Sequence, residues 1–113
     1  MIDLTTMTAM KMYPDAHLDS LTENQKTMAF KFNYAVLYST GGVELRRVLA
    51  DDTSKFLFVD APHFSATLLF LGEQVFAATP VLTHWVGKTV DELFEYAKER
   101  GWKITSRAPG GAS

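Results

Sequence analysis

The chain has 113 residues, of which 47% are apolar and 21% charged, a composition that is typical of globular domains and excludes a disordered polar chain. The formal net charge of −2 argues against a general nucleic-acid binder, because phosphate contacts need an excess of Lys and Arg. Cysteine is absent, which excludes disulfides, thiolate nucleophiles and cysteine zinc sites. We expect one domain that is stabilised by side-chain packing alone.

The N-terminal segment, residues 1–19, is expected to be an arm or a short helix that ends before Pro14. Its methionines are suited to packing against a sheet or against a partner. The segment has neither a basic leader nor an apolar core, so we expect no signal peptide. Ser20-Leu-Thr-Glu23 then matches a capping box, which predicts a short helix over 20–27.

The segment 28–38 has a large, mainly apolar side chain at every second position, a period that predicts a strand. These residues are Met28, Phe30, Phe32, Tyr34, Val36 and Tyr38. Gly41-Gly42 predicts a tight turn, after which 43–49 is expected to return as the second strand of a hairpin. An alternative extends the helix to Tyr38, because several apolar residues of the segment also lie near one helical stripe. We favour the strand, since aromatic and β-branched residues favour strands.

Three more strands are expected over 55–60, 64–71 and 75–79, because each is a short apolar run bounded by turn residues. Thr89-Val-Asp-Glu92 is a second capping box, and Gly101 stands where helix ends favour a left-handed residue. These signals predict a helix over 89–100. Residues 102–106 alternate in polarity, which is typical of a further strand.

The predicted fold is therefore α+β: an antiparallel β-meander of five to six strands, with a C-terminal helix at about 89–100 packed on one face and a short N-terminal helix. The domain is expected to span 20–106 as a single unit. Residues 107–113 contain Pro109-Gly110-Gly111 and are expected to form a mobile tail.

The best catalytic candidates are Asp60, His63 and His84, because histidine titrates near neutral pH and a carboxylate can orient it. No nucleophile elbow, phosphate-binding glycine loop or zinc helix motif is present, so a non-catalytic protein is favoured over an enzyme. The segment 15–19, with one histidine between two aspartates, matches no standard metal-ligand spacing. We expect neither a metal nor a cofactor.

The connection that begins at Pro80 has large apolar residues where a polar loop would be typical. The predicted partner-binding residues are Val81, Leu82, His84 and Trp85. Tryptophan is enriched at the energetic centres of interfaces, which favours this assignment. The competing interpretation is that Trp85 fills the end of the sheet beneath the helix.

A basic group lies next to the aromatic segment and has the ingredients of a stacking platform for single-stranded nucleic acid. Its cations are Lys31, Arg46 and Arg47. This interpretation requires the rings of Phe30, Phe32 and Tyr34 to be exposed. Because such rings usually form the core beneath a helix, we regard nucleic acid as the less favoured partner.

The sequence thus favours a small non-catalytic protein-binding module, an adaptor or an inhibitor of a larger complex, which is also the profile of phage proteins that block host factors. The alternatives are a small-molecule-binding or hydrolytic domain that uses His63, His84 and Asp60, and a single-strand binder. The longest uncharged stretch, 74–87, is too short to span a bilayer, so we expect a cytoplasmic protein with no membrane contact. Exposed strand edges would permit a homodimer.

Overall fold

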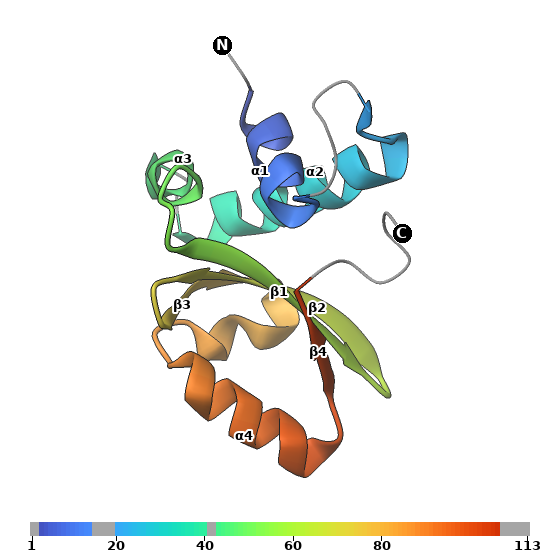
Figure 1. Ribbon diagram of the computed structural model, residues 1–113, viewed down its shortest axis with the longest axis vertical. Helices are drawn as coiled ribbons and strands as arrows, with labels where there is room; N and C mark the ends of the chain where they lie inside the picture. Colours follow the sequence, from blue (N-terminus) through green and yellow to red (C-terminus); the bar gives the residue numbers. More distant parts are fainter. Residues whose placement is uncertain (1–2, 15–19, 41–42, 107–113) are drawn as a thin grey trace.

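An antiparallel sheet separates two layers of helices (Figure 1). The computed structural model describes residues 3–14, 20–40 and 43–106, and this part of the chain contains four strands. The strands are β1 (Ser54–Ala61), β2 (Phe64–Leu71), β3 (Gln74–Ala78) and β4 (Lys103–Thr105), in the order β3-β2-β1-β4. One face of the sheet is covered by α1 (Leu4–Met12), α2 (Glu23–Thr40) and α3 (Val43–Leu49). The other face is covered by the 3₁₀ segment η2 (Pro80–Trp85) and by α4 (Val90–Arg100).

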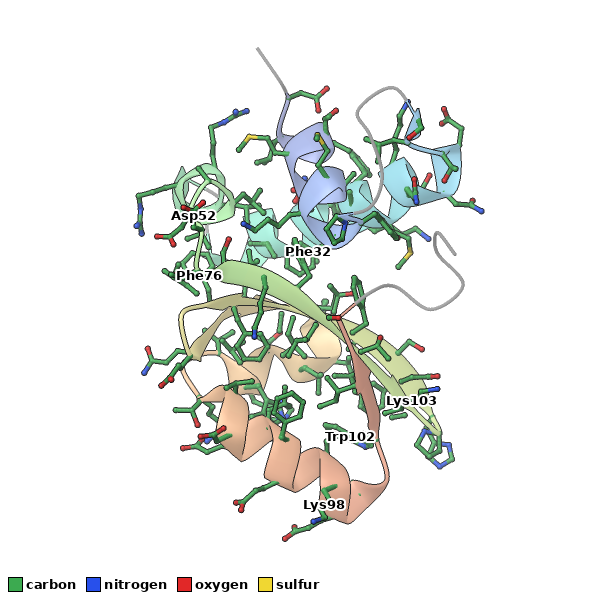
Figure 2. All side chains as sticks on the ribbon, in the orientation of Figure 1. Phe32, Asp52, Phe76, Lys98, Trp102 and Lys103 are labelled. Carbon is green, nitrogen blue, oxygen red and sulfur yellow. The ribbon has the colours of Figure 1, made fainter. Side chains whose placement is uncertain are left out.

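Two hydrophobic cores lie on the two faces of the sheet. Phe56 of β1 packs with the α1–α3 layer, where its ring meets that of Phe32 edge-on with the centroids 5.0 Å apart. Leu57, the next residue, packs with the α4 layer instead, since successive side chains of a strand point to opposite faces. Phe32 and Trp102 mark the two layers in Figure 2. Burial on both faces explains why β1 and β2 are nearly continuous apolar runs.

The prediction of five to six strands is wrong, because 28–38 and 43–49 are helical. The buried side chains of α2 include those of Ala29, Phe32, Asn33 and Val36, which have the i, i+3, i+4, i+7 spacing of a helix. In α3 they are those of Leu45, Val48 and Leu49. With this spacing, the helices pack their apolar side chains onto one face of the sheet. A hairpin would instead pair with an edge of the sheet and leave that face uncovered. The α+β class and the antiparallel pairing are retained.

The start of α2 also differs from the predicted capping box at Ser20–Glu23. The box is formed two residues later, by Thr22 and Gln25. The Thr22 hydroxyl oxygen accepts a hydrogen bond from the Gln25 N–H (3.1 Å), and Gln25 Oε1 accepts one from the Thr22 N–H (2.9 Å). The helix therefore spans Glu23–Thr40. The sequence predicts a shorter helix over 20–27.

The C-terminal half agrees with the sequence prediction. Thr89 caps α4 by accepting a hydrogen bond from the Glu92 N–H (3.2 Å), and Gly101 ends the helix in the left-handed region with φ 73°. The segment after Gly101 adds β4, which pairs with β1. The outer edge of β3 is partly paired, since Val75 exchanges hydrogen bonds with Lys88 (2.9 Å) and Gly87 (2.8 Å). The predicted turn at Gly41-Gly42 and the predicted tail at 107–113 lie outside the described residues.

Candidate interaction surface

The exposed side of α2 is unusually apolar. Among the described residues six large apolar side chains are exposed, and three of them, Met28 (41%), Phe30 (56%) and Tyr34 (53%), belong to this helix. Phe30 and Tyr34 are one helical turn apart, and we call these two residues the apolar face of α2. Met28 lies two residues before Phe30 and therefore on the other flank of the helix. All three lie off the buried stripe of the helix, so the core does not account for them. Clustered exposed apolar residues of this kind are typical of interaction sites.

The two aromatic rings of this face support one another. Phe30 and Tyr34 are one helical turn apart, and their ring centroids lie 6.1 Å apart with a tilt of 33°. An aromatic side chain has only two torsion angles to fix, so its ordering costs little entropy on binding. The pair therefore presents a pre-organised apolar surface.

A groove of about 290 Å³ lies on the other flank of α2, beside Met28. Met28, Lys31 and Ala35 of α2 form one wall, and residues of the sheet and of the β3–η2 junction, including Thr67 and Pro80, form the other. Its lining is mainly apolar, and Lys31 is the charged side chain among the described residues that line it. The groove is thus suited to an apolar group and continues the surface made by Met28.

The structure places the predicted catalytic residues on three different segments. Asp60 lies at the end of β1, His63 in the β1–β2 turn and His84 in η2, and all three are exposed. The hydroxyl of Ser65 lies 3.5 Å from Asp60 Oδ1, a long contact across the strand pair. Among the described residues, no three His, Asp or Glu side chains are grouped so that they could hold a metal ion. The 15–19 segment lies outside these residues.

The structure places the predicted partner-binding residues on η2, and they divide into two groups. Trp85 (5% exposed) and Leu82 (2%) are part of the core beneath the sheet, whereas Val81 and His84 are exposed. The Trp85 ring packs on Tyr96 of α4 with centroids 5.1 Å apart. Trp85 therefore fills the end of the sheet in this structure, and a contact with a partner through it stays a prediction.

The predicted basic group is distributed over two helices. Lys31 lies on α2, and Arg46 and Arg47 lie on α3; all three are exposed. Phe32 is 2% exposed, so the platform of three exposed rings that nucleic-acid stacking requires is absent. Of these three rings, those of Phe30 and Tyr34 face solvent.

Sequence reasoning missed the apolar face of α2, because it assigned these residues to the inner side of a strand. The useful signal was the Thr22–Gln25 capping pair, which fixes the start of a helix. Once the helix is accepted, Met28, Phe30 and Tyr34 fall outside its buried stripe.

No family model, no curated protein and no solved structure matches this chain. In the described part of the chain, the helices are too short or too polar to cross a bilayer. The functional assignment therefore depends on the chemistry of the surface itself.

Proposed function

We propose that this protein is a small non-catalytic binding module that associates with protein through the apolar face of α2. The observation that carries the proposal is the exposure of Phe30 and Tyr34 on one helix. Tyrosine and phenylalanine are enriched in protein interfaces. An exposed apolar helix face of this kind can pack against a hydrophobic groove or a helix of a partner, which is a recurring mode of recognition.

An adaptor or inhibitor acts by occupying a surface of a larger assembly and needs no catalytic group. The acidic net charge and the lack of cysteine fit the cytoplasmic role expected from composition.

The test is a tagged capture experiment with two matched double variants. Phe30→Ser with Tyr34→Ser removes the apolar face of α2. Val86→Ser with Phe94→Ser removes two other exposed apolar side chains, which lie in the layer on the opposite side of the sheet. We expect the first variant to lose a protein, or an untagged copy of this chain, that the wild type and the second variant both retain. Retention by all three proteins would contradict the proposal.

A further inference from the structure

The exposed side of α2 carries two opposite charges at equal distances from one central residue. Glu23, Thr27 and Lys31 follow one another at intervals of four residues, so they lie along a single line on the helix surface. All three are exposed, and the side chain of Glu23 is 93% accessible. A carboxylate and an ammonium group therefore lie at equal distances on either side of a small central residue.

From this pattern we infer that the partner of the apolar face of α2 is a second copy of this chain, bound with the two α2 helices antiparallel and crossing at Thr27. The inference rests on the proposed function, since it names the partner of the same surface. A two-fold interface must be self-complementary: if residue i meets residue j of the partner, j must meet i. Crossing at Thr27 brings Glu23 of each copy opposite Lys31 of the other, which makes two ion pairs from one pair of residues.

Other features of the helix fit this arrangement. Thr27 is small, and small residues at a crossing point let helix axes approach to about 8–10 Å. Phe30 borders the line of charges and becomes covered when the helices meet. Tyr34 lies seven residues from the crossing point, beyond the start of the partner's α2. Glu23 Oε1 lies 3.9 Å from Lys26 Nζ of the same helix, which is a long contact between exposed groups. Exchanging it for a contact with the partner therefore costs little free energy.

Thr27 also lies on the side of α2 that neighbouring elements leave open. The sheet and α1 occupy the opposite side of the helix, where Phe32 meets Phe56 and Asn33 lies 2.8 Å from the hydroxyl of Thr8. Because exposed ion pairs contribute little free energy, we expect a dissociation constant in the micromolar range.

The test is a charge exchange measured by sedimentation equilibrium on the purified protein. Lys31→Glu leaves two carboxylates on the line, and Glu23→Lys leaves two ammonium groups, so each variant alone repels its own copy. We expect each to raise the dimer Kd at least about tenfold at low salt, with the thermal melting curve showing that it is folded. The double variant Glu23→Lys with Lys31→Glu should regain the wild-type Kd. An equimolar mixture of the two single variants should form a heterodimer.

Other outcomes overturn the inference in distinguishable ways. A wild-type protein that is monomeric at about 1 mM has no second copy as its partner. If such a monomer still loses a captured protein on Phe30→Ser with Tyr34→Ser, the proposed function stands and the inference alone fails. If the single variants dimerise with the wild-type Kd, or if their mixture forms no heterodimer, the helices do not cross at Thr27.

Discussion

Phe30 and Phe32 lie two residues apart on α2 and have opposite environments: Phe30 is 56% exposed, whereas Phe32 is 2% exposed and packs edge-on against Phe56. In a strand the two rings would share a face; in this helix they do not. The same residue type therefore serves the core at one position and the surface at the other. The distinction is measurable, because the two rings contribute very differently to folding.

Phe32→Ala should lower the free energy of unfolding by about 3–5 kcal/mol, since it leaves a cavity between α2 and the sheet. Phe30→Ala should change it by no more than about 0.5 kcal/mol at low protein concentration, because the ring is already in contact with water. Urea denaturation monitored by circular dichroism measures both. Equal losses for the two variants would mean that Phe30 is part of the core.

Trp85 provides a second test, on the opposite face of the sheet. Trp85→Ala should cost about 3–5 kcal/mol of stability, because the ring packs on Tyr96 and fills the core beneath the sheet. Trp85→Phe should cost much less. The phenylalanine ring keeps most of the packing. The substitution also removes the buried Nε1–H of Trp85, which has no hydrogen-bond partner among the described residues. A Trp85→Ala protein of wild-type stability would contradict this placement.

The stability should fall in acid partly through Asp3, the N-cap residue of α1. The hydrogen bond from the Thr6 N–H (2.7 Å) holds the pKa of Asp3 below its usual value of 3.8. A lowered pKa in the folded state adds stability above the unfolded pKa, and this stability is lost as the pH falls through the folded value. Asp3→Asn keeps a capping side chain but has no charge to lose. Its melting temperature should therefore fall less than that of the wild type between pH 7 and about pH 3; an identical fall would contradict this role.

The end of α4 gives a prediction for Gly101. Its φ of 73° is unfavourable for side chains with a Cβ, although no atom lies within 4 Å of the position that a Cβ would occupy. Gly101→Ala should therefore cost about 1–2 kcal/mol from backbone conformation alone. Gly101→Asn should cost less, because asparagine tolerates the left-handed region. Thermal unfolding of the two variants compares them, and equal costs would point to a steric cause instead.

The helix α4 could be predicted from the sequence because all of its local signals agree. Thr89 caps the first turn, Leu93 and Ala97 form the buried stripe, and Gly101 ends the helix. The three long strands could be predicted for a similar reason, since each is an apolar run between turn residues. In these segments the local preferences and the packing favour the same structure.

The helix α2 could not be predicted in this way, because two demands are combined in one segment. Phe32 and Val36 serve the core, whereas Phe30 and Tyr34 lie on the surface, and together they produce an alternating pattern that imitates a strand. Residues that break the rule for their own element are expected at functional sites. The failure of the strand prediction therefore points to the same residues as the exposure of their side chains.

The position of the surface could not be predicted either, because it depends on which side of α2 is covered. That choice is made by α1 and the sheet, which are distant in sequence from the helix. The buried contact between Thr8 and Asn33, 25 residues apart, lies on the covered side of α2, whereas Thr27 and Phe30 are exposed.

Disulfide trapping tests most directly whether copies of this chain meet through α2. The chain has no cysteine, so Thr27→Cys introduces a single thiol at the proposed crossing point. His63→Cys introduces one in the exposed β1–β2 turn as the matched control. Under mild oxidation we expect Thr27→Cys to form a covalent dimer quickly and His63→Cys to form one slowly, because a disulfide needs Cα atoms about 4.4–6.8 Å apart. Equal rates for the two variants, or faster trapping at position 63, would contradict the account.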